Sequence, residues 1–193
     1  YEDIIGTYLV QLSSHSLSDS ESQESTELLK TIGDFERISD HAVNVLESAE
    51  ELQSKGLSFS PAAMAEYETL ARAIREILHL SLDSFRQNDA ARAARVEPLE
   101  QVIDKLKEEM RTRHILRMRQ GQCSIEAGFV WADLLTDLER TSDHCSNIAG
   151  CVIDLRQHNL NLHASLQASR SGSEEYLQKY HAYASKYALP AAK

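Results

Sequence analysis

Two stretches of the chain repeat one acidic pattern, DFERISDHAVN at residues 34–44 and DLERTSDHCSN at residues 137–147. Each places a glutamate four residues before an aspartate, Glu36 before Asp40 and Glu139 before Asp143. On a helix, side chains at this spacing lie on one face, one turn apart. Because two stacked carboxylates repel each other, the pattern predicts a partner that is a cation, a hydrogen-bond donor or a metal ion.

A third acidic pair with the same spacing, Glu100 and Asp104, lies between the two stretches. Helical bundles build multinuclear metal sites from carboxylates that face inward on neighbouring helices. Oxygen-rich sites of this kind suit Mg, Mn, Fe or Zn. The candidate metal ligands are therefore Glu36, Asp40, Glu100, Asp104, Glu139 and Asp143. The alternative is a solvated helix face, but such a face does not require the Arg, Ser, Asp, His and Asn that the two copies share in register.

Further polar residues are candidates for supporting these ligands. His41 and His144 each follow a ligand aspartate directly and so point in a different direction, which favours a donor to the ligands or a surface residue over a ligand. Arg37 and Arg140 also point away, either toward a neighbouring helix or around the cluster as a brace. The full supporting set is Asp34, Arg37, His41, Asn44, Glu97, Asp137, Arg140, His144 and Asn147.

Helices must position all of these residues. Apolar residues recur every three or four positions almost throughout, and the chain has only 7 Gly and 3 Pro. We expect helices over residues 1–12, 19–53, 61–86, 90–119, 125–157 and 174–187. Ser18, Ser60 and Ser124 are expected to cap helix starts, while Gly56 and Gly121 suit helix ends. Four long helices with short connections predict an all-α antiparallel bundle.

Composition excludes several classes of function. The 193 residues carry a net charge of −10 without a basic stripe, which argues against nucleic-acid binding. No apolar run reaches the roughly 20 residues of a membrane span. Three cysteines without a framework indicate reduced thiols. Against an enzyme, the chain has no Gly-rich phosphate loop and no nucleophile elbow, and Glu76 with His79 gives only one Glu-x-x-His pair where a di-iron site needs two.

The repeat extends beyond the acidic stretch, because YEDIIG at residues 1–6 is similar to LEQVID at residues 99–104. In both copies this element precedes the helix that carries the acidic pattern. We therefore expect a first repeat over residues 1–55 that lacks its first helix, a second repeat over residues 56–160, and a C-terminal tail over residues 161–193 with a short helix.

The phrases ERISDHAVN and ERTSDHCSN resemble the signature of PhoU-like domains. The resemblance implies two three-helix repeats in a phosphate-regulating protein, with a multinuclear cluster of Fe, Zn or Mn on the six acidic residues named above. Glu2 matches the glutamate of a fourth acidic pair, but its partner position is Gly6. The cluster of the first repeat is therefore expected to be smaller or absent.

Longer phrases, such as TIGDFERISDHAVNVLESAEEL and VEPLEQVIDKLKEEMRTRHI, resemble the C-terminal region of bacterial sodium/phosphate cotransporters. This likeness implies a non-enzymatic regulatory domain at the cytoplasmic face of the membrane, with the transporter domain upstream in the same polypeptide. The main alternative is a free-standing PhoU-like regulator that acts on a separate transporter or sensor kinase. A purely structural bundle and a carboxylate-bridged metal enzyme are weaker alternatives, and a homo-oligomer stays open.

Overall fold

A computed structural model describes residues 1–157 and 174–191, which contain helices and no β-strand. This confirms the predicted all-α class. The helices are α1 (Glu2–Ser13), α2 (Asp19–Ser54), α3 (Pro61–Gln87), α4 (Ala90–Ala93), α5 (Val96–Arg119), α6 (Ile125–Gln157) and α8 (Glu174–Lys186). Their bounds lie within one or two residues of the predicted ones, apart from one interruption described below. Residues 158–173 and 192–193, which belong mostly to the predicted tail, lie outside the described part of the chain.

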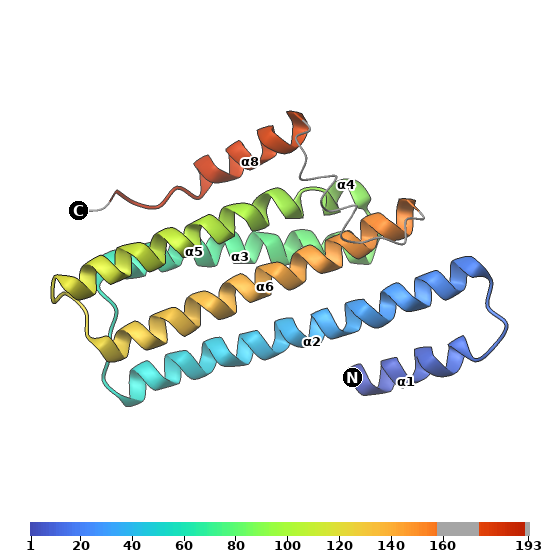
Figure 1. Cartoon of the computed structure of the whole chain (residues 1–193), viewed down its shortest axis with the longest axis horizontal. Coiled ribbons are helices and arrows are strands. Elements are labelled where there is room, and N and C mark those ends of the chain that lie inside the picture. The colour runs from blue at the N-terminus through green and yellow to red at the C-terminus, as the bar shows by residue number, and fades with distance from the viewer. Residues whose placement is uncertain (158–173, 192–193) are drawn as a thin grey trace.

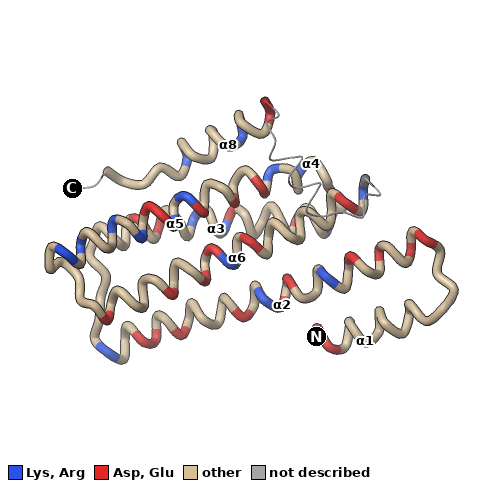
Figure 2. The backbone as a smooth tube through the Cα atoms, in the orientation of Figure 1, with Lys and Arg blue, Asp and Glu red and all other residues tan. Residues whose placement is uncertain are grey.

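Helix α6 is the centre of the arrangement, because it contacts α2, α3, α4 and α5. Helices α3, α5 and α6 pack together as a three-helix core (Figure 1). Helix α2 runs antiparallel to α6 along its other side, and α1 folds back on α2 (Figure 1). Helix α8 lies on α5. Acidic residues are spread over the long helices rather than gathered on one of them (Figure 2).

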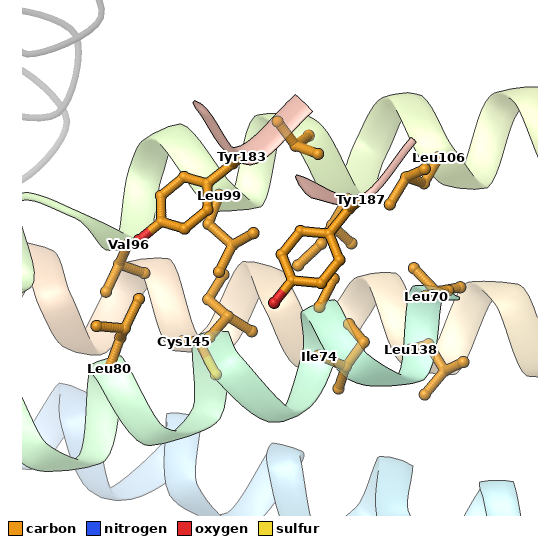
Figure 3. Close-up of a cluster of buried hydrophobic side chains, with 14 of the residues drawn as sticks. Leu70, Ile74, Leu80, Val96, Leu99, Leu106, Leu138, Cys145, Tyr183 and Tyr187 are labelled. Atoms are coloured by element: carbon orange, nitrogen blue, oxygen red, sulfur yellow. The ribbon is translucent and has the colours of Figure 1, made fainter. Parts of the chain in front are cut away.

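The apolar core lies between α3, α5 and α6. Leu70, Ile77, Leu99 and Ile103 are completely buried there, and their spacing of seven residues on α3 and four on α5 aligns each pair on one helix face. Burying one such side chain contributes about 1.5–3 kcal/mol. Figure 3 shows that Tyr183 of α8 and Tyr187, which directly follows α8, cover one side of this cluster. The core therefore fixes the relative rotation of α5, which carries Glu100 and Asp104, and α6, which carries the second acidic pattern.

The expected helix caps are present. The Ser18 hydroxyl accepts a hydrogen bond from the Glu21 amide in a complete capping box. The hydroxyls of Ser60 and Ser124 accept single hydrogen bonds from the amides of Ala63 and Ala127 at the starts of α3 and α6. Gly56 and Gly121 have φ values of 62° and 69°, a left-handed conformation that strains other residues. These local signals end the helices where the sequence predicted.

The predicted helix over residues 90–119 is interrupted, which corrects the sequence-based expectation. The short helix α4 ends at Ala93, and α5 begins at Val96. Pro98 explains the break, because a proline ring clashes with the carbonyl group four residues earlier and has no amide hydrogen to donate to it. That carbonyl belongs to Ala94, the residue at which the helical path stops.

The two copies of the acidic pattern are not equally covered. On α6, Cys145 is completely buried and Ser146 is 7% exposed, and the Ser81 hydroxyl of α3 donates to the Cys145 carbonyl. The matching residues of α2, Ala42 and Val43, are exposed, Val43 by 52%. Within the described residues, α3 covers this face on α6 and no helix does so on α2. The division into repeats at residues 55 and 56 stays a prediction.

None of the described helices combines the length and the apolar character that crossing a membrane requires.

Candidate carboxylate metal site

Three of the six predicted ligands come together between α5 and α6. One oxygen from each of Glu100, Asp104 and Asp143 lies within 4.8 Å of the other two. Glu100 is 6% exposed, and the other two carboxylates are partly buried. The helices bring them together because Glu100 and Asp104 lie one turn apart on α5, opposite the turn of α6 that carries Asp143. The geometry fits a hard cation, which takes clustered carboxylate oxygens as ligands.

Glu139, one turn before Asp143 on α6, forms an ion pair with Lys107 of α5, whose Nζ lies 2.9 Å from Glu139 Oε1. Burial, and then the negative charge of Glu139, raises the pKa of Asp143. Such a shift means that the lost hydration of Asp143, and then the nearby charge of Glu139, are incompletely compensated here. Lys107 was absent from the predicted set, although it lies one turn from Asp104 on the same face of α5. A bound cation would relieve the same repulsion.

The two arginines of the pattern lie beside the carboxylates of their own helix. Arg140 Nη1 is 3.4 Å from Asp143 Oδ2, and its Nε is 3.9 Å from Glu139 Oε2. Arg37 lies 3.9 Å from an oxygen of each of Glu36 and Asp40. The arginines were predicted either to pair with a neighbouring helix or to brace the acidic residues. The structure shows the second placement, with each arginine beside the acidic pair of its own helix.

The acidic pair of the first copy stays outside the cluster. The side chains of Glu36 and Asp40 are 40% and 51% exposed, and among the described residues only the second-copy acids form a group compatible with a metal ion. Glu2 lies near Gly33 on α2, and Gly6 offers no carboxylate. That the first-repeat cluster is smaller or absent stays a prediction.

Six of the nine residues predicted to support the metal ligands instead bond to one another across the contact between α2 and α6. Asp34 Oδ1 accepts a hydrogen bond from Asn147 Nδ2 at 3.0 Å and lies 2.8 Å from His144 Nδ1. Asp137 Oδ1 in turn accepts from Asn44 Nδ2 at 2.9 Å and lies 2.7 Å from His41 Nδ1.

These two clusters are reciprocal, because each copy of the pattern supplies the aspartate of one and the histidine and asparagine of the other. They join α2 to α6 across more than 90 residues of sequence. The spacing that the two stretches share thus also produces a symmetric contact between the two copies. The remaining supporting residue, Glu97, accepts a hydrogen bond from Ser146 Oγ at 2.7 Å and ties α5 to α6 in the buried interior.

The fold and site together define an all-helical bundle protein with a duplicated acidic pattern and a carboxylate cluster suited to a hard metal ion. Residues 67–152, which span most of α3 through α6, match the sequence profile of the family described as the PhoU domain. This segment is therefore similar to a PhoU domain, as the acidic pattern indicated.

Relatives of known name support this assignment. The chain is 28% identical over 147 residues to a phosphate-specific transport system accessory protein, PhoU homolog 1, of Thermotoga maritima. It is 30% identical over 128 residues to the PhoU homolog of Pseudomonas aeruginosa, which carries the same description. These matches cover 76% and 65% of this chain but only 62% and 51% of the relatives.

The crystal structure of PhoU from Pseudomonas aeruginosa has a similar fold. It superposes with a TM-score of 0.74 at 26% sequence identity, over 81% of this chain and 75% of that one. The likeness therefore extends beyond the segment that matches the family profile. The link to sodium/phosphate cotransporters, expected from longer phrases, has no counterpart among these relatives.

Proposed function

We propose that this protein regulates phosphate uptake as a metal-binding PhoU-like accessory protein that acts on a separate transport system from the cytoplasmic side. The observation that carries the proposal is the carboxylate cluster of Glu100, Asp104 and Asp143 within the PhoU-like segment. The names of the relatives, which are accessory proteins of phosphate-specific transport, support a separate transporter over a membrane domain in the same polypeptide.

The proposed cation is a divalent ion of Fe, Mn or Zn, held by those three carboxylates. A second ion of the expected multinuclear cluster would also need Glu139, which Lys107 now neutralises. A bound ion joins α5 to α6 at a point where negative charge otherwise repels. Occupancy would then change the stability of this helix pair, and with it the surface that a transporter or sensor kinase meets. We propose no catalytic step, and the expected homo-oligomer stays a prediction.

Metal content tests the site, with the other copy of the pattern as a matched control. Asp143 and Asp40 are equivalent in the repeat, but only Asp143 belongs to the cluster. We expect the untagged wild-type protein and D40N to retain at least one equivalent of Fe, Mn or Zn after reconstitution and desalting, and D143N to lose it. Equal metal content in all three proteins, or none in the wild type, would contradict the site.

Phosphate uptake tests the function. The gene is deleted from its host, and the strain is complemented with wild type, D143N or D40N before uptake of labelled phosphate is measured at low and high phosphate. We expect the deletion to misregulate uptake, wild type and D40N to restore it, and D143N to fail. Uptake that does not respond to the deletion would reject the function while leaving the metal site intact. Reading the codons upstream of Tyr1 separates the accessory protein from the cotransporter domain.

A further inference from the structure

A cavity of about 440 Å³ lies between α5 and α6, beyond the carboxylate cluster. Lys107, Arg111 and His114 line it from α5, at steps that continue the face of Glu100 and Asp104. From α6 it is lined by the turns that precede Glu139, between Ile125 and Thr136. Its volume falls within the range of small-molecule binding sites. One interhelical groove thus carries acids at one end and this cavity at the other.

The far end of the cavity is apolar and open to solvent. Phe129 and Ile125 are each 69% exposed, and Ile115 is 40% exposed. Scattered exposed apolar residues are ordinary, but these three line one cavity, Ile115 from α5 and the other two from α6. Covering them would remove apolar surface from water and would favour a ligand with an apolar body.

The end nearest the acidic cluster is basic. Among the residues that the structure describes, Lys107 and Arg111 line the cavity and no aspartate or glutamate does, although the chain has 30 acidic and only 20 basic residues. His114 adds no charge at neutral pH, because burial, and then the charge of Arg117, lowers its pKa. The charge of Lys107 is neutralised by its ion pair with Glu139, whereas Arg111 is exposed at the mouth of the cavity. The charge of the cavity therefore favours an anion.

The inner wall holds polar nitrogen atoms that lack a protein partner. Trp131 is 1% exposed and His114 is 3% exposed, and their rings stack with centroids 5.6 Å apart. Within the described part of the chain, neither Trp131 Nε1 nor His114 Nδ1 has a hydrogen-bond partner. A buried indole N–H without an acceptor costs about 1–3 kcal/mol. Trp131 thus lies in the wall of the cavity, where its fluorescence can sense a bound ligand.

We propose that this cavity binds a small amphiphilic anion, such as a medium-chain carboxylate. Its head group pairs with Arg111 and Lys107, and its apolar body covers Phe129 and Ile125. The enclosed volume favours a small molecule over a helix of a partner protein. The inference rests on the cavity alone and is independent of the proposed role in phosphate uptake.

Trp131 is the single tryptophan of the chain, so its fluorescence reports binding directly. Octanoate is titrated into the full-length protein below its micelle concentration, with octan-1-ol as the uncharged control and octylammonium as the cationic one. We expect a saturable change of Trp131 emission with octanoate, and at least tenfold weaker binding of both controls. Equal binding of the three, or no saturable change, would overturn the proposal.

Variants then locate the site. R111Q should weaken octanoate binding about tenfold, whereas R119Q, which removes an exposed charge from the same helix outside the cavity, should not. A132F, at an exposed position on the cavity wall, should abolish binding while circular dichroism shows an intact helical fold. If A132F does not fold, the octanoate affinities of R111Q and R119Q test the site. Equal affinities of R111Q and R119Q for octanoate would overturn the small-molecule site. The site would also be overturned if anionic phosphatidylglycerol vesicles displace octanoate and other carboxylates do not.

Discussion

The imidazole rings of His41 and His144 stack across the contact between α2 and α6, with centroids 5.7 Å apart and planes inclined by 28°. Each ring bonds through Nδ1 to an aspartate of the opposite copy of the acidic pattern, His41 to Asp137 and His144 to Asp34. The two equivalent histidines therefore meet at the centre of a symmetric contact. The duplicated pattern specifies this contact as well as the carboxylates.

We expect the cross-helix pairs to contribute to stability as coupled units. A double-mutant cycle with Asp34→Ala and His144→Ala, followed by urea unfolding in the presence of a chelator, should give a coupling energy of about 1 kcal/mol. The chelator removes any effect through the neighbouring metal site. His15→Ala, at an exposed position, should change the free energy of unfolding by less than about 0.5 kcal/mol. Additivity of the two substitutions within about 0.3 kcal/mol would show that the pair does not act across the interface.

A buried ion pair between α3 and α5 should be much more sensitive. Arg117 donates to both carboxylate oxygens of Glu66, at 2.9 and 2.8 Å, and Arg113 lies 3.3 Å from one of them. Glu66 is 3% exposed, so Glu66→Gln leaves buried positive charge without its counter-ion. We expect a loss of about 3–5 kcal/mol in urea unfolding. Glu68→Gln, on the exposed face of the same helix, is the matched control and should cost little. Comparable losses in the two variants would refute this account.

The attachment of α8 should depend on pH. Glu76 of α3 accepts hydrogen bonds from Lys186 Nζ, at 2.6 Å, and from the Tyr187 hydroxyl. Burial opposes ionisation of Glu76, but these two bonds outweigh it and lower its pKa below the ordinary 4.5. Burial, and then the bond to Glu76, raises the pKa of Tyr187 from 10 to about 12.

The directions of these two pKa shifts define the pH range in which α8 is held against α3. The contribution of Glu76 is present above pH 4.5 and is lost as the pH falls through its lowered value. That of Tyr187 is present below pH 10 and is lost as the pH rises toward 12. The protection factors for hydrogen exchange over residues 174–186, which correct for the intrinsic pH dependence of amide exchange, should therefore be highest near neutrality and lower at both extremes. Glu76→Gln should speed this exchange at pH 7, whereas Glu175→Gln, at an exposed position on α8, should not. If Glu76→Gln leaves α8 protected, the helix is held by its apolar contacts alone.

Lys107 should compete with metal for the acidic cluster. Its ammonium group neutralises Glu139, and its charge partly offsets the rise in the pKa of Asp143 that burial and Glu139 cause. Lys107→Met removes a positive charge from beside the proposed cation, so the affinity for Mn²⁺ measured by calorimetry should rise about tenfold. Lys55→Met, which removes an exposed lysine at the end of α2, serves as the control for net charge. An unchanged affinity in Lys107→Met would place the ion elsewhere.

Much of the fold could be predicted because helices depend on local signals. Apolar spacing gave the helix positions, and the serine caps and glycines gave their ends, each through contacts within a few residues. The one interruption, before Pro98, also has a local cause that the periodicity of residues 90–119 concealed. The acidic pairs on α5 and α6 could be recognised because their four-residue spacing stacks them on any helix.

The partners of those side chains could not be predicted in the same way. The sequence by itself determined which residues share a helix face, since this follows from helical geometry alone. Only the tertiary structure decided that Asp143 joins Glu100 and Asp104 while its equivalent Asp40 stays exposed, and that His144 turns to Asp34 rather than to a ligand. The physical reason is that the partner across a helix contact depends on the rotation and stagger of the two helices. The packing of α3, α5 and α6 sets these quantities, and for α2 that packing is different.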